Sequence, residues 1–138
     1  MKSSGWLSFS AIILLVAGIM RIFDAIWALM NTGTAAANLH GAILGHSLTT
    51  YGVVWLIVGL ILCAAGFLVL NPDTLSAKIS RWVGILAAAI GGITAIAWMP
   101  YYPVWSLVYI GTAIVVIYGL IAGFAEVRDS SPTYRASR

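Results

Sequence analysis

Residues 51–70 read YGVVWLIVGLILCAAGFLVL and contain no charged side chain. A helix rises about 1.5 Å per residue, so about 20 such residues cross the roughly 30 Å hydrocarbon core of a bilayer. The whole 138-residue chain has the same character: 62% of its residues are hydrophobic and 8% are charged, whereas a soluble protein has about 25% charged residues. This stretch therefore predicts a membrane-spanning helix in an integral membrane protein.

Three further apolar runs accompany this stretch. Asn31 to Thr34 and Asn71-Pro72 follow the first and second runs, and PYYP at 100–103 separates the third from the fourth. Each proline disfavours helix in the residue before it. We predict an all-α membrane protein, a four-helix up-down transmembrane bundle that forms one domain over residues 1–125. The spans are expected at about 6–30, 49–70, 81–99 and 104–124, and residues 126–138 are expected to be a polar cytoplasmic tail.

The cationic residues predict the orientation. In a four-span chain, six of the seven lie on one side of the membrane: Lys2, Lys78, Arg81, Arg128, Arg135 and Arg138. The opposite loops, 31–48 and 100–103, contain no Lys or Arg. Because positive residues favour the cytoplasmic side, we expect a multi-pass protein of the bacterial plasma membrane with both termini in the cytoplasm.

Apart from Arg81 at the start of the third span, Arg21 and Asp24 are the only charged residues inside a predicted span. Their i,i+3 spacing places them on one helical face, about 22 Å beyond Trp6 and therefore toward the outer boundary. An ionisable residue in a membrane is a candidate for function because an unpaired charge there is costly. We expect a structural pair, with the arginine reaching toward the headgroups. The alternative is a role on an ion, proton or substrate path.

Aromatic residues gather near the outer ends of the predicted helices. They are Trp27, Tyr51, Trp55, Trp98, Tyr101, Tyr102 and Trp105. This pattern is typical of an aromatic belt at the membrane–water interface, which needs no ligand. The alternative interpretation is an outer-leaflet pocket whose rings stack on a lipid or an isoprenoid.

Small residues recur at helical spacing, and they are candidates for helix packing or oligomer contacts. They are Gly18, Gly84, Ala88, Gly91, Gly92, Gly119 and Gly123. Small residues let helices approach closely, within one chain or between copies. We predict a homo-oligomer with closed symmetry, in which a second copy covers the faces that four helices leave unfilled.

Groups that carry catalysis or bind metals are scarce in the sequence. The single cysteine, Cys63, excludes a disulfide within the chain and a CxxC centre. His40 and His46 share their predicted loop with no Cys, Asp or Glu that could complete a metal site. A net charge of +3, with the cations mostly at chain ends and in one loop, does not indicate nucleic-acid binding. We expect no catalytic residue, cofactor or metal, and no enzymatic activity.

Several short motifs resemble one family. They are Gly5-Trp6, Gly18 with Asp24, LTTYG at 48–52, Arg81-Trp82 with Gly84-Ile85, PYYPVWS at 100–106 and IYGL at 117–120. Together they resemble an actinobacterial family of four-span membrane proteins that is described as a domain of unknown function. The resemblance covers about residues 5–124. It implies the same four-helix fold and an actinobacterial plasma membrane, and it supplies no activity.

Three functions fit this sequence. The first is a small non-enzymatic membrane protein that associates with itself or serves as an accessory or structural component of a larger membrane complex. The second is an oligomeric channel or small transporter with Arg21 and Asp24 on the path. The third is an outer-leaflet lipid-binding protein. Membrane lipid is an expected partner in each.

Overall fold

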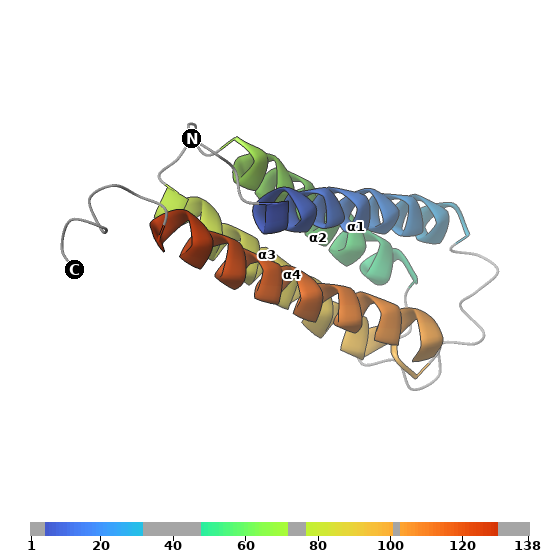
Figure 1. The fold of residues 1–138 in the computed structure, drawn as a ribbon. Coiled ribbons are helices and arrows are strands. Elements are labelled where there is room, and N and C mark those ends of the chain that lie inside the picture. Colours follow the sequence, from blue (N-terminus) through green and yellow to red (C-terminus); the bar gives the residue numbers. More distant parts are fainter. Residues whose placement is uncertain (1–4, 32–47, 72–76, 101–102, 130–138) are drawn as a thin grey trace.

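The protein is an all-α bundle of four helices. The computed structural model describes residues 5–31, 48–71, 77–100 and 103–129. The helices are α1 (Gly5–Met30), α2 (Leu48–Leu70), α3 (Ala77–Trp98) and α4 (Pro103–Asp129) (Figure 1). The predicted all-α fold with four long apolar helices is confirmed.

The helix ends follow from local sequence. Pro103 begins α4, where its fixed φ angle suits the first turn and its missing N–H is not needed. The carbonyls of Trp27 and Phe67 accept hydrogen bonds from the backbone N–H groups of Asn31 and Asn71, both at 3.1 Å. The side-chain amides of the same asparagines donate second hydrogen bonds to these carbonyls at 2.9 and 3.0 Å, at the ends of α1 and α2. Two bounds differ from the prediction by more than one residue: α3 begins four residues before 81, and α4 continues to residue 129. The first four residues of the expected polar tail are therefore helical.

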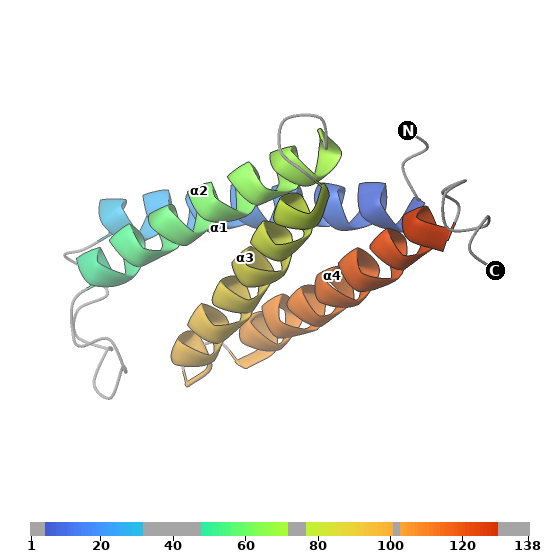
Figure 2. The same cartoon turned by 90° about the vertical axis from the view of Figure 1, so that its left-hand side faces the viewer.

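The helices form two hairpins, α1–α2 and α3–α4, that diverge toward one end of the bundle. Figures 1 and 2 both show the end of α4 beside the start of α1, whereas the start of α4 lies well away from the end of α1. We call the end that contains Gly5 the closed end and the end that contains Met30 the open end. At the closed end the Trp6 and Tyr118 rings pack edge to face with centroids 5.8 Å apart.

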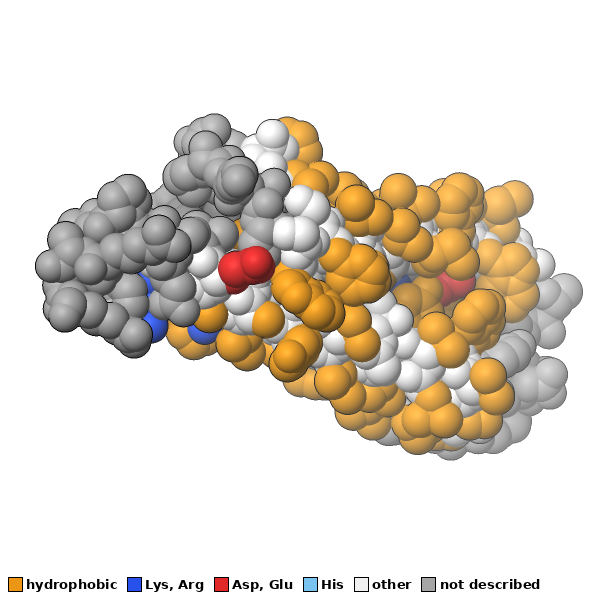
Figure 3. Space-filling view, in the orientation of Figure 1, with side chains coloured by type: hydrophobic (Ala, Val, Ile, Leu, Met, Phe, Trp, Pro, Cys, Tyr) orange, Lys and Arg blue, Asp and Glu red, His pale blue; other side chains and the backbone are white. Residues whose placement is uncertain are grey.

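Apolar side chains from all four helices fill the bundle between these ends. Leu14, Leu62, Ala88 and Val116 come from α1, α2, α3 and α4 in turn, and each is at most 3% exposed. The outward positions are also apolar, as Figure 3 shows over much of the described surface. All four helices are long and apolar enough to cross a membrane. The chain is therefore a multi-pass membrane protein.

The seven small residues singled out in the sequence are all buried within this single chain. A Cβ added at Gly18 would lie 2.8 Å from the Gly59 carbonyl oxygen of α2, and one added at Gly84 would lie 2.8 Å from Leu120 of α4. One added at Gly92 would lie 3.2 Å from Ala113 of α4. These residues bring helices of the same molecule together. The homo-oligomer stays a prediction. Its interface would have to lie on another surface, because helices of the same chain already cover these small residues.

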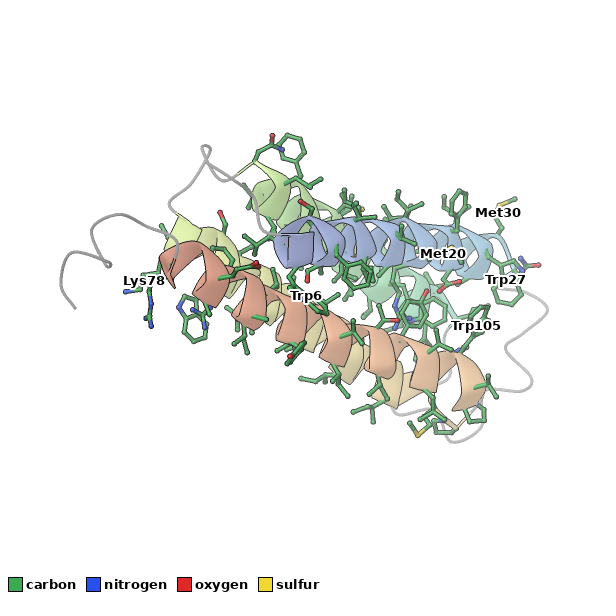
Figure 4. The ribbon with its side chains drawn as sticks, viewed as in Figure 1. Trp6, Met20, Trp27, Met30, Lys78 and Trp105 are labelled. Atoms are coloured by element: carbon green, nitrogen blue, oxygen red, sulfur yellow. The ribbon has the colours of Figure 1, made fainter. Side chains whose placement is uncertain are left out.

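The orientation of the termini also stays a prediction, and the two ends of the bundle allow a direct measurement. Met30 and Lys78 lie at opposite ends (Figure 4). In a Cys63→Ser background, we expect Met30→Cys to react with a membrane-impermeant maleimide in intact cells and Lys78→Cys to react only after permeabilisation. The reverse pattern would contradict cytoplasmic termini. Labelling of both from outside would contradict the four-span topology.

Candidate functional site, a polar cavity that joins an apolar groove

A cavity of about 280 Å³ lies where the two hairpins diverge. All four helices contribute to its lining, which consists of Arg21, Asp24, Trp27, Trp55, Ala95, Trp98, Trp105, Ser106 and Tyr109. In the space-filling view, acidic and basic atoms are recessed among hydrophobic side chains toward the open end (Figure 3). The cavity therefore places charged groups inside an otherwise apolar part of the molecule.

Arg21 points into the bundle, so the expectation that it reaches toward the headgroups is wrong. Its side chain is 2% exposed. Nη2 donates a long hydrogen bond of 3.5 Å to the carbonyl of Gly91 in α3. The guanidinium carbon lies 3.8 Å from the ring centroid of Tyr109 and 5.7 Å from that of Trp55, a cation–π arrangement. The buried Nε has no hydrogen-bond partner.

Asp24 contacts Arg21 only through Tyr109. The Tyr109 hydroxyl donates to Asp24 Oδ2 at 2.9 Å, while the face of the same ring packs on the guanidinium of Arg21. The direct ion pair expected between the two charges is not formed, although both are in the described part of the chain. Tyr109 instead joins them, with a charge-assisted hydrogen bond on one side and a cation–π contact on the other. The i,i+3 spacing indicated the shared face but not this partner, because nothing in the sequence places α4 against α1.

Three residues of the predicted aromatic belt are core residues instead. Tyr51, Trp55 and Trp98 are 1%, 4% and 8% exposed. The Trp98 ring lies 4.6 Å from Tyr51 and 4.8 Å from Trp55, centroid to centroid. These rings belong to one packed cluster, and two of them, Trp55 and Trp98, line the cavity. The sequence shows how far along a helix each ring lies, but it does not show which way the ring points.

Two other residues of the predicted belt are exposed on the surface of the chain. Trp27 and Trp105 are 52% and 57% exposed. They point toward each other across the gap between α1 and α4 (Figure 4) and line the mouth of the cavity. Tyr101 and Tyr102 lie outside the described residues. Trp27 and Trp105 therefore fit both interpretations, an aromatic belt and the rim of a pocket lined by aromatic rings.

A groove of about 550 Å³ between α1 and α4 continues from the cavity. The two share Asp24, Trp105 and Tyr109. The rest of its lining is almost entirely apolar and consists of Ile13, Val16, Ala17, Met20, Leu107, Val108, Gly111, Thr112 and Val115. Along α1 these residues precede Arg21, so the groove extends from the cavity toward the middle of the helices.

The cavity offers several groups that can bind a ligand. Besides Arg21 Nε, the hydroxyl of Ser106 is buried and has no hydrogen-bond partner. Asp24 supplies acceptor oxygens, and the aromatic rings supply apolar faces. Within the described ranges, no three His, Cys, Asp or Glu side chains gather in a way that could hold a metal ion. His40 and His46 lie outside these ranges.

Together these features define a four-helix membrane protein with a polar cavity that opens into an apolar groove between α1 and α4. The chain belongs to the family described as a domain of unknown function (DUF7144), whose model matches residues 6–124. No curated protein and no solved structure matches the chain. The match includes all of the residues that line the cavity and the groove.

Proposed function

We propose that this protein is a non-enzymatic membrane protein that takes up a lipid from the side, out of the bilayer. The headgroup occupies the cavity at Arg21, and a hydrocarbon chain lies in the groove between α1 and α4. One observation carries the proposal. A buried arginine with an unpartnered N–H lies in a polar cavity that is continuous with an apolar groove on the membrane-facing surface.

The energetics favour a ligand with hydrogen-bond acceptors. A buried donor without a partner costs about 1–3 kcal/mol, and more when the group is charged. An oxygen of a headgroup would remove that cost at Arg21 Nε and could also bind the hydroxyl of Ser106. The groove adds burial of hydrocarbon between two helices, where close packing is the main source of affinity in lipid.

The position of the site also suits a lipid. The groove lies toward the middle of α1 and the cavity lies toward its end, so the apolar and polar parts follow the order found in one leaflet of a bilayer. With the orientation predicted from the cationic residues, that leaflet is the outer leaflet of a bacterial plasma membrane. Trp27 and Trp105 then lie at the depth where tryptophan favours the interface.

The channel or transporter alternative has less support. Toward the closed end, Leu14, Leu62, Ala88 and Val116 pack together between the cavity and the other side of the bundle. A conduction path would therefore have to form between several copies. A role as an accessory or self-associating component is compatible with lipid binding, but no contact within the described chain favours it specifically.

The lipid retained by the purified protein tests the proposal. We expect native mass spectrometry in a mild detergent to show bound lipid on the unmodified protein. We expect Arg21→Gln to reduce it roughly tenfold, the equivalent of about 1.4 kcal/mol. Lys78→Gln is the matched control, because it neutralises an exposed cation at the other end of the bundle.

A second variant separates loss of binding from loss of folding. Gly111 lines the groove, and a Cβ added there meets nothing within 4 Å, so we expect Gly111→Leu to place its side chain in the groove. We expect this variant to keep its thermal stability and lose the bound lipid. Unchanged lipid retention in both Arg21→Gln and Gly111→Leu would overturn the proposal.

A further inference from the structure

We infer that the headgroup bound in this cavity is zwitterionic, with a phosphate at Arg21 and an ammonium group at Asp24, as in a phosphoethanolamine lipid. The inference rests on the proposed function and specifies its ligand. It comes from the fact that one cavity presents both a buried cation and a carboxylate to the same occupant.

The phosphate half of the site consists of Arg21 and Ser106. A guanidinium offers donors in a planar fork that matches phosphate oxygens. In Arg21 the Nη2 group already donates to Gly91, whereas the buried Nε has no partner. The buried hydroxyl of Ser106 is likewise unpartnered. Two unpartnered groups on different helices therefore line the place where phosphate oxygens would lie.

The ammonium half consists of Asp24 and the tryptophans at the mouth. Asp24 Oδ2 accepts from Tyr109, and a carboxylate has further acceptor sites for an ammonium group. Trp27 and Trp105 line the same cavity, and indole faces attract cations. A purely anionic headgroup would instead lie against the Asp24 carboxylate in a site of low dielectric, where repulsion between like charges is strong.

The order of these groups along α1 matches a phospholipid in a leaflet. The groove includes residues 13–20, and Arg21, Asp24 and Trp27 then line the cavity in sequence toward the open end. A phospholipid has the same order from the middle of the membrane outward: hydrocarbon chain, phosphate and ammonium group, followed by the aqueous interface. Arg21 and Asp24 are offset by about 4.5 Å along the helix axis, which a two-carbon linker between phosphate and ammonium can span. The cavity of about 280 Å³ is many times the roughly 10–15 Å³ that one water molecule needs, so it can admit a group of several non-hydrogen atoms.

The test is a competition in nanodiscs of defined composition. They contain equal amounts of phosphatidylethanolamine, phosphatidylglycerol and diacylglycerol with identical acyl chains, and native mass spectrometry reads the lipid that stays bound. We expect the unmodified protein to retain phosphatidylethanolamine roughly tenfold over phosphatidylglycerol. Asp24→Asn should remove or reverse that preference, and the exposed Glu126→Gln at the closed end should leave it unchanged.

A second variant and a soluble competitor complete the test. Trp27→Leu changes a largely exposed ring, and we expect it to weaken binding of phosphatidylethanolamine but not of phosphatidylglycerol. Free glycerophosphoethanolamine lacks the hydrocarbon chains and should not displace the lipid; complete displacement would overturn a lipid as the ligand. A preference of the unmodified protein for phosphatidylglycerol or diacylglycerol, or no preference, would overturn the zwitterionic headgroup and leave lipid binding intact. Retention of no lipid from any mixture would overturn both.

Discussion

Gly18→Ala is expected to destabilise the bundle by about 2–3 kcal/mol, the upper part of the range for overpacking a tight interface. The added Cβ would lie 2.8 Å from the backbone nitrogen of Cys63 and 2.8 Å from the carbonyl oxygen of Gly59. Backbone atoms cannot rotate away as a side chain can, so α1 and α2 would have to separate. The intrinsic preference of alanine for helix, worth up to about 1 kcal/mol, acts in the opposite direction and is too small to compensate.

Thermal unfolding followed by circular dichroism in one detergent measures this effect. Gly111→Ala is the matched control, since its Cβ meets nothing within 4 Å. We expect the control to be as stable as the unmodified protein or slightly more stable, because it gains helix propensity without a clash. Equal stability of the Gly18→Ala and Gly111→Ala variants would show that the close approach of α1 and α2 is not required.

Asp24→Asn is expected to cost on the order of 3 kcal/mol, because it leaves the buried guanidinium of Arg21 without a nearby negative charge. Asp24 is only partly buried, so Arg21→Gln leaves a carboxylate that the cavity and the Tyr109 hydroxyl can still stabilise. We therefore expect Arg21→Gln to cost less than Asp24→Asn. The double variant should also cost less than Asp24→Asn alone, since no uncompensated charge remains.

A double-mutant cycle of unfolding free energies measures the coupling between the two charges. Tyr109→Phe removes the donor to Asp24 but keeps the ring beneath Arg21, and we expect a smaller loss than for Asp24→Asn. Lys78→Gln with Glu126→Gln is a control cycle at the other end of the bundle. There we expect the change in unfolding free energy of the double variant to equal the sum of the changes in the two single variants. Strict additivity for Arg21 and Asp24 would contradict coupling through Tyr109.

Much of the fold could be predicted from the sequence because its signals are local. A run such as 51–70 is apolar for the full thickness of a bilayer, and Asn31, Asn71 and Pro103 mark helix ends through their own backbone and side-chain chemistry. The four spans, their order and the all-α class follow from these features. The presence of Arg21 and Asp24 on one face of the first helix also followed, because helical periodicity alone determines it.

The direction in which each helix face points was decided by the tertiary structure. In a soluble helix an apolar stripe marks the buried side, but α2 and α4 are apolar on every side. Lipid and protein interior are equally apolar, so hydrophobicity does not separate them. The sequence therefore could not place Tyr51, Trp55 and Trp98 in the core or Arg21 in a cavity.

The candidate site could not be predicted in full for the same reason. Arg21 and Asp24 were identified from the sequence as the charges inside a span, but their partner Tyr109 lies 85 residues beyond Asp24. The cavity exists because small residues hold α1 against α2 and α3–α4 diverges from that pair toward the open end. The sequence by itself determined which segments cross the membrane and which charges they carry. Close packing between helices, which depends on shape and not on polarity, decided which residues face one another and left the space for a ligand.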